Sequence, residues 1–123
     1  MKNLFLLLFT LLIISCSDSE EENFNLVGEW NRPMILVDGD NIIDDCQIRD
    51  TFDFKSNGIF IGVYYYYNNN GICEEEDFQN STWELSGNTL IIDGDSIVII
   101  NIIDNNTFEI IEDDDYIEVF TRI

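Results

Sequence analysis

Short runs of β-branched and aromatic residues alternate with clusters of Asn, Asp, Gly and Ser throughout residues 26–123. Runs that recur every 8 to 12 residues or so are typical of an all-β domain. No run has the apolar periodicity of an amphipathic helix. The pattern predicts strands at residues 28–37, 47–55, 58–67, 82–86, 89–93, 96–103, 107–112 and 116–122. The long loops are residues 38–45 and 68–80.

The predicted turns are short, and all but the aspartate turn at residues 113–115 contain Gly or Asn, which adopt positive φ readily and join antiparallel neighbours. Consecutive strands should therefore pair as hairpins. A series of such hairpins can close on itself and leave no exposed edge. The predicted fold class is all-β, an eight-stranded antiparallel up-and-down barrel.

Turn chemistry also predicts the register of one hairpin. A three-residue loop that ends in a left-handed Gly58 pairs Phe54 with Phe60, whereas a two-residue turn pairs Phe54 with Ile61. The Ser and Asn before Gly58 favour the three-residue loop.

A second hairpin turns at residues 87–88, which pairs Leu85 with Leu90 and Trp83 with Ile92. Both registers place an apolar set on one face of the sheet. The residues predicted to point inward are Trp30, Phe52, Phe54, Phe60, Trp83 and Leu85. They are equally candidates for the lining of a ligand site and for the ordinary core.

The first residues predict an export signal. Lys2 precedes an apolar run at residues 4–14, which is interrupted only by Thr10 and is too short to span a bilayer. The run ends in Ile-Ile-Ser-Cys at residues 13–16, which resembles a bacterial lipobox. Residues 1–15 are then a lipoprotein signal peptide, and a lipid on Cys16 anchors the chain in a membrane. The alternative is an ordinary signal peptide beside an unrelated cysteine.

Residues 16–25 are polar and acidic, as expected of a flexible tether between the lipidated cysteine and a domain at residues 26–123. An acidic run directly after the lipidated cysteine also resembles the surface-export signal of lipoproteins in the Bacteroidota. This resemblance implies the outer membrane, with the domain at the cell surface. The alternative is a periplasm-facing anchor in which the run is only a spacer.

The charge balance excludes several functions. The chain has 25 acidic and 5 basic residues, no histidine and a formal net charge of -20. Such a charge repels phosphate backbones, so no nucleic-acid partner is expected. Without histidine there is no Ser-His or Cys-His catalysis and no His-ligated metal. We expect no enzyme activity, no cofactor and no metal site.

Cys46 and Cys73 are the remaining thiols, and an exported protein meets an oxidising environment. A structural disulfide is therefore predicted. A pair of thiols without histidine makes only half of a zinc site, and a redox pair would more naturally be spaced Cys-x-x-Cys.

Several segments together resemble the lipocalin-like lipoproteins of the Bacteroidota. They are Leu-Val-Gly-Glu-Trp at residues 26–30, residues 52–60, Thr-Trp-Glu-Leu-Ser-Gly-Asn at residues 82–88, and Phe-Thr-Arg at residues 120–122. The resemblance implies a lipocalin-like barrel in which Trp30 packs beneath Arg122 and closes the floor. The chain is shorter than typical lipocalins, and short strands leave little interior space.

Two further features could form surface contacts. Residues Tyr64, Tyr65, Tyr66 and Tyr67 alternate faces on a strand, so two rings could stack against a sugar or a partner protein. The alternative is that tyrosine simply suits strands. Residues 96–103 are apolar on both faces and require a cover, which could be residues 38–45, another loop, or a second molecule in a homodimer or partner complex.

The acidic clusters are expected to be solvated turns. None has the spacing of an EF-hand calcium loop. The predicted function is therefore non-enzymatic: a membrane-anchored lipocalin-like lipoprotein that binds a small apolar or amphipathic molecule. The alternative is a solid barrel whose loops and tyrosines contact a protein or glycan.

Overall fold

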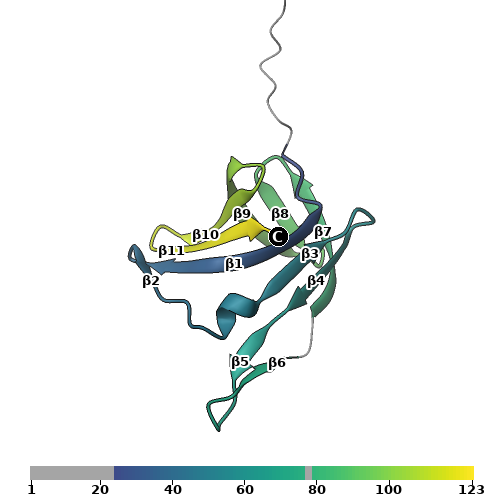
Figure 1. The fold of residues 1–123 in the computed structure, drawn as a ribbon. Helices are drawn as coiled ribbons and strands as arrows, with labels where there is room; N and C mark the ends of the chain where they lie inside the picture. Colours follow the sequence, from purple (N-terminus) through teal and green to yellow (C-terminus); the bar gives the residue numbers. More distant parts are fainter. Residues whose placement is uncertain (1–23, 77–78) are drawn as a thin grey trace, which may run out of the picture.

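Nine strands form one antiparallel sheet, and the pairing of β11 with β1 closes eight of them into a barrel (Figure 1). The computed structural model describes residues 24–76 and 79–123. The barrel strands are β1 (Gly28–Val37), β3 (Thr51–Phe54), β4 (Ile59–Val63), β7 (Gln79–Ser86), β8 (Thr89–Ile92), β9 (Ser96–Asp104), β10 (Thr107–Asp113) and β11 (Tyr116–Arg122). The predicted eight-stranded antiparallel barrel is confirmed.

Three shorter features lie beside the barrel. The two-residue β2 (Asp40–Asn41) pairs with the end of β1, and a 3-10 helix, η1 (Gln47–Arg49), precedes β3. Strands β5 (Tyr65–Tyr67) and β6 (Cys73–Glu75) form a separate hairpin that projects from the barrel (Figure 1). Within residues 24–76 and 79–123, no helix has the length and apolar character needed to cross a membrane.

Both predicted registers are confirmed. Phe54 pairs with Phe60 across a turn in which Gly58 has a φ of 82°. Leu85 pairs with Leu90, and Trp83 pairs with Ile92. Local turn chemistry therefore fixes which side chains of these hairpins face inward.

Two predicted strands were too long. Residues 47–49 form η1 instead of extended chain, because the Asp44 carboxylate accepts the backbone N–H groups of Cys46 and Gln47. The predicted strand 58–67 breaks at Tyr64, where the chain leaves the barrel to enter the β5–β6 hairpin. Strand β4 consequently pairs with β7 and not with the strand that follows it in the chain.

β1 carries the irregularity that shapes the interior. Its register against β11 shifts between Asn31 and Met34, which marks a bulge around Pro33. Proline cannot donate to a strand ladder and is tolerated in a central strand mainly at such bulges. Trp30 before the bulge and Arg32 within it are both buried.

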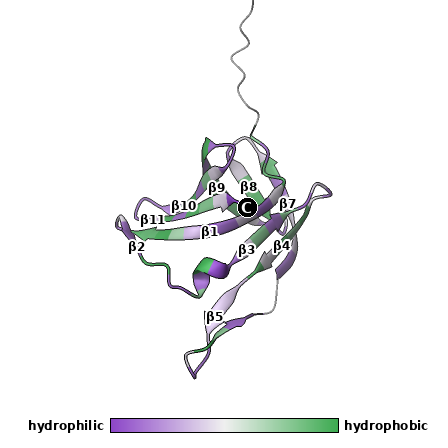
Figure 2. Ribbon diagram, viewed as in Figure 1, coloured by the Kyte–Doolittle hydropathy of each residue, from purple (hydrophilic) through white to green (hydrophobic). Residues whose placement is uncertain are grey.

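A largely aromatic core lies inside the barrel. Its buried members are Leu26, Trp30, Phe52, Phe54, Phe60, Leu90, Ile100, Phe108 and Phe120. Hydrophobic residues are concentrated in the barrel strands, whereas the short hairpin strand β5 is pale in the hydropathy colouring (Figure 2). Each buried side chain of this size contributes about 1.5 to 3 kcal/mol to folding.

One end of the barrel is closed by a floor made of Phe24, Trp30, Phe108 and Arg122. The Trp30 and Phe108 rings lie 4.7 Å apart, and the Arg122 guanidinium lies 4.2 Å from the centre of the Trp30 ring. Arg122 also donates to the backbone carbonyls of Asn25, Val27 and Asn105, so it joins the lead-in segment to the β9–β10 turn. The structure therefore brings Trp30 and Arg122 together at the barrel floor.

A close approach explains the glycine at the start of β1. Gly28 has a φ of 133°, and a Cβ there would lie 2.9 Å from Nη1 of Arg122. A larger residue would displace the guanidinium that covers the floor.

Candidate functional site

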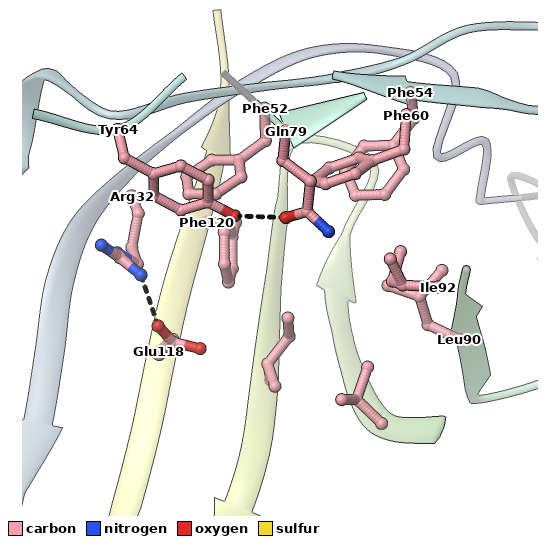
Figure 3. A pocket seen from close by; sticks show the side chains of 12 residues that line it. Arg32, Phe52, Phe54, Phe60, Tyr64, Gln79, Leu90, Ile92, Glu118 and Phe120 are labelled. Carbon is pink, nitrogen blue, oxygen red and sulfur yellow. Dashed lines mark hydrogen bonds and ion pairs between the residues drawn. The ribbon is translucent and has the colours of Figure 1, made fainter. Parts of the chain in front are cut away.

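Above the floor, the barrel contains a partly open cavity of about 290 Å³. Its wall is mostly apolar and includes residues from all eight barrel strands. The apolar lining residues are Phe52, Phe54, Phe60, Leu90, Ile92, Val98, Ile110 and Phe120, and the polar ones are Arg32, Tyr64, Gln79 and Glu118 (Figure 3). We call these four polar residues the polar end of the cavity.

Aromatic rings form one side of the apolar wall. Phe52 packs edge-on against Phe120 at 5.1 Å and lies 6.3 Å from Phe60. The structure thus places Phe52, Phe54 and Phe60 on the cavity wall, where the sequence suggested either lining or core. Trp83 and Leu85 instead pack against the core from outside the cavity.

A buried charge cluster stands at the polar end. Arg32 donates from Nη1 to Glu118 at 2.5 Å and from Nη2 to Asp50 at 2.6 Å. All three residues are at least nine-tenths buried. The guanidinium also lies 5.5 Å from the centre of the Phe52 ring, and its buried Nε has no hydrogen-bond partner among the described residues.

Burial dominates the electrostatics of both carboxyl groups. Loss of solvent raises the pKa of Glu118 above its usual range, although the neighbouring Arg32 acts in the opposite direction. The pKa of Asp50 is raised for the same reason, against the hydrogen bond from the Tyr65 N–H and the charge of Arg32. One guanidinium does not compensate fully for two buried carboxylates.

Tyr64 and Gln79 form the rim of the cavity. The sequence suggested a surface contact for Tyr64, but the ring is half-buried and packs edge-on against Phe52 at 5.6 Å. Its hydroxyl donates to Oε1 of the exposed Gln79 at 3.1 Å, and burial raises its pKa. Gly62 permits this position, because a Cβ there would lie 3.0 Å from the Tyr64 ring.

The other three tyrosines belong to the projecting hairpin. Tyr66 and Tyr67 are exposed, and the Tyr66 hydroxyl donates to Glu74 at 3.3 Å. Tyr65 is half-buried, and its backbone N–H donates to Asp50 at 2.8 Å. Asp50 therefore links the cavity's charge cluster to the hairpin.

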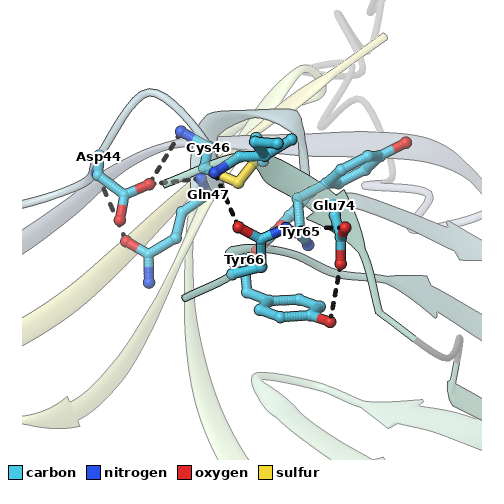
Figure 4. The surroundings of a disulfide bond; sticks show 10 residues. Asp44, Cys46, Gln47, Tyr65, Tyr66 and Glu74 are labelled. Carbon is cyan, nitrogen blue, oxygen red and sulfur yellow. Dashed lines mark hydrogen bonds between the residues drawn. A yellow bond between two sulfur atoms is a disulfide. The ribbon is translucent and has the colours of Figure 1, made fainter. Parts of the chain in front are cut away.

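The predicted disulfide between Cys46 and Cys73 is confirmed (Figure 4). It joins the residue before η1 to the first residue of β6, with the Cα atoms 5.5 Å apart. Cys46 is fully buried. The covalent bond and the Asp50–Tyr65 hydrogen bond together hold the hairpin beside the polar end.

Sequence reasoning missed Arg32, Asp50, Glu118 and Gln79. A signal for three of them was present, because Arg32 is two residues after the inward Trp30, Asp50 is two residues before the inward Phe52, and Glu118 is two residues before the inward Phe120. Strand alternation alone would have directed all three into the barrel. Gln79 lies in the predicted loop 68–80, where no periodicity applies.

The outer face of β9 stays uncovered within the described part of the chain. Ile97, Ile99 and Ile103 are each more than half exposed. Residues 38–45 were one expected cover, but part of this segment pairs with β1 as β2 instead. No group of three or more His, Cys, Asp or Glu side chains within residues 24–76 and 79–123 is arranged to hold a metal ion.

Cys16 and the signal and tether predictions for residues 1–23 lie outside the described residues. The tether's last two residues, 24 and 25, are described: Phe24 packs against Trp30 and Phe108, and Asn25 accepts a hydrogen bond from Arg122. The predicted boundary at residue 26 therefore separates Phe24 from the floor to which it belongs.

Comparisons with known proteins agree with the topology. Residues 26–121 match the sequence profile of the family described as "Lipocalin-like domain". A lipocalin-like protein from Bacteroides uniformis has a similar structure, with a TM-score of 0.57, 14% identity, and 80% of this chain and 98% of that chain covered. An uncharacterized protein from Bacteroides eggerthii is also similar, with a TM-score of 0.53 and 12% identity, and the match covers 80% of this chain and 100% of that chain. At these identities the likeness concerns the fold alone. No curated protein matches the chain.

Proposed function

Since the chain belongs to the family of lipocalin-like domains, we propose that its barrel binds a small apolar or amphipathic molecule in the interior cavity. The observation that carries this proposal is a cavity of about 290 Å³ whose wall is mostly aliphatic and aromatic. Ligand sites typically begin near about 300 Å³ and combine an apolar wall with a few polar groups. The cavity suits a short-chain molecule and not a large lipid.

The arrangement of the wall favours an amphipathic ligand. An alkyl or small aromatic body would contact Phe52, Leu90 and Ile110, and a polar head would lie near Glu118 and Tyr64. No covalent step is required, so the proposed function is non-enzymatic.

Octanol is a suitable probe, because it is neutral, short and amphipathic. We expect isothermal titration calorimetry on the purified protein to show saturable binding with a negative heat-capacity change, the signature of apolar burial. Val98→Trp should lower the affinity about tenfold or more, because the larger ring occupies the cavity. Absence of binding by octanol and by its charged analogues octylamine and octanoate would refute the proposal.

A matched control lies on the same strand. Ile97 is 66% exposed on the outer face of β9, so Ile97→Trp adds the same ring outside the barrel. We expect this variant to bind octanol like the wild type. Equal losses in both variants would mean that the affinity change does not come from the cavity.

We also propose that a lipid on Cys16 anchors the domain in the bacterial outer membrane, with the cell surface as the favoured side. The lipobox-like residues 13–16 and the acidic run behind them support this proposal. The chain enters the barrel at the floor, where Phe24 packs against Trp30, so the polar end would face away from the membrane. Cys16→Ala should release the protein into the soluble fraction, and retention in the membrane pellet would refute the anchor.

A second candidate function is a surface interaction module. It is favoured by the uncovered isoleucines of β9 and by the exposed Tyr66 and Tyr67. Under this alternative, a homodimer or partner complex would cover Ile97 and Ile99. Sedimentation of the wild type and of an Ile97→Lys/Ile99→Lys variant tests the homodimer. If the homodimer forms through this face, the wild type should sediment as a dimer and the variant as a monomer, and a monomeric wild type would contradict it.

A further inference from the structure

The polar end of the cavity has an excess of negative charge, and this imbalance bears on the ligand that the proposed function requires. Among the described residues that line the cavity, Arg32 is the only cation. Its two terminal nitrogens each donate to a carboxylate, one on Asp50 and one on Glu118. The guanidinium charge is therefore already matched, and one carboxylate charge is left over.

No other described cation can supply the missing charge. Arg122 lies at the floor, and Lys55 pairs with Asp53 at 3.3 Å near the β3–β4 turn. Arg49 is exposed in η1. The excess charge must be met by solvent, by protons or by a ligand.

Glu118 is the carboxylate that a ligand would meet. Glu118 lines the cavity, whereas Asp50 is not among the lining residues. Asp50 accepts hydrogen bonds from Arg32 and from the Tyr65 N–H. One oxygen of Glu118 accepts from Arg32, and the other points away from Arg32 toward the apolar side chains of the cavity (Figure 3). This second oxygen is an acceptor at the boundary between the polar end and the apolar wall.

We infer that the cavity selects an organic cation, a primary amine with a short apolar body, whose ammonium group donates to the free oxygen of Glu118. This inference rests on the proposed function and names the ligand class for the same site. The apolar body would lie among Leu90, Val98 and Ile110. In a poorly solvated site, the hydrogen bond from an ammonium group to a carboxylate is stronger than the bond from a neutral alcohol to the same oxygen, because the two groups carry opposite charges.

The same arrangement disfavours anionic amphiphiles such as fatty acids. A carboxylate ligand would bring a third negative charge to a cluster that holds only one positive charge, and like charges at short range repel. The net charge of -20 adds to this effect by attracting cations and repelling anions during approach. The raised pKa of Glu118 agrees with this arrangement, because an ammonium group would relieve the cost of the buried charge.

Three ligands with the same tail distinguish the head groups: octylamine, octanol and octanoate. We expect calorimetry at neutral pH and moderate salt to rank them in this order of affinity. The amine should bind about tenfold more tightly than octanol, because only the amine adds the attraction between opposite charges to its hydrogen bond. Octanoate should bind more weakly than octanol.

Glu118→Gln removes the excess charge and keeps an acceptor for Arg32. In this variant the preference for octylamine over octanol should disappear, because the head group of either ligand then meets a neutral amide instead of a carboxylate. The matched control is Glu84→Gln on β7, which changes the net charge equally but at an exposed position outside the barrel. It should keep the wild-type preference.

The outcomes separate this inference from the proposed function. If octanol binds but octylamine binds no better, or octanoate binds best, the choice of an organic cation is wrong and the ligand cavity stands. A preference that persists in Glu118→Gln would also overturn it, because bulk charge would then be its origin. If none of the three binds, the proposed function itself fails.

A readout in the wild type covers the case in which the variant does not fold. The carbon resonance of the Glu118 carboxylate should shift on addition of octylamine and shift little with octanol. An unmoved resonance at saturating octylamine would overturn the inference.

Discussion

The disulfide between Cys46 and Cys73 allows a quantitative test of what stabilises this small barrel. It closes a loop with a sequence separation of 27 residues. In the chain-entropy model, opening a loop of this length raises the entropy of the unfolded chain and lowers the free energy of unfolding by about 3.5 kcal/mol. For a domain of roughly 100 residues, this loss corresponds to a fall in melting temperature of about 20 °C.

The folded state should survive the loss. The β5–β6 hairpin is also held by the bond from the Tyr65 N–H to Asp50 and by the bond from the Glu76 N–H to the Tyr64 carbonyl. The effect should therefore come mainly from the unfolded chain. A Cys46→Ala/Cys73→Ala double variant avoids placing a hydroxyl at the fully buried position 46.

The assay is urea unfolding of the oxidised wild type, the reduced wild type and the double variant. The two forms without the bond should agree with each other and lie about 3.5 kcal/mol below the oxidised protein. A loss below about 1 kcal/mol in both would refute the loop-entropy reasoning. A loss in the double variant alone would point to packing at position 46.

Two further predictions concern the floor and the polar end. Arg122→Ala should lower the free energy of unfolding by about 2 to 4 kcal/mol, since the substitution removes the cation over Trp30 and several hydrogen bonds to backbone carbonyls. Urea unfolding measures this loss, and a loss of less than about 1 kcal/mol would contradict the prediction. The pKa of Glu118 is higher in the folded protein than in the unfolded chain, so the folded protein binds a proton at this position more readily. The contribution of Glu118 to stability is therefore lost as the pH rises through the pKa of the folded state. The stability of the wild type relative to Glu118→Gln should thus increase as the pH falls from neutral toward the usual glutamate range, and a difference independent of pH in a denaturation series would contradict it.

Much of the barrel could be predicted from local information. Each of the eight predicted strands overlaps a barrel strand, because the alternation of side chains and the turn residues act over a few positions. The Phe54–Phe60 register followed from the turn before Gly58 in the same way. The disulfide followed from the count of cysteines and the expected export.

The course of the chain after Val63 could not be predicted locally. Four tyrosines in succession favour one continuous strand, yet the strand breaks at Tyr64. The break depends on Asp50, which accepts the Tyr65 N–H from 15 residues away, and on the disulfide to β6. Neither contact leaves a pattern in the tyrosine segment itself.

The sequence by itself determined the fold class, the strands and the inward face of two hairpins, since these depend on neighbours in the chain. Only the tertiary structure decided the cavity and its charge cluster. Arg32 meets Asp50 across 18 positions when β1 pairs with β3, and it meets Glu118 across 86 positions only once β11 closes against β1. The energy of a buried charge depends on which groups surround it, so the chemistry of the site is a property of the closed barrel and not of any one segment.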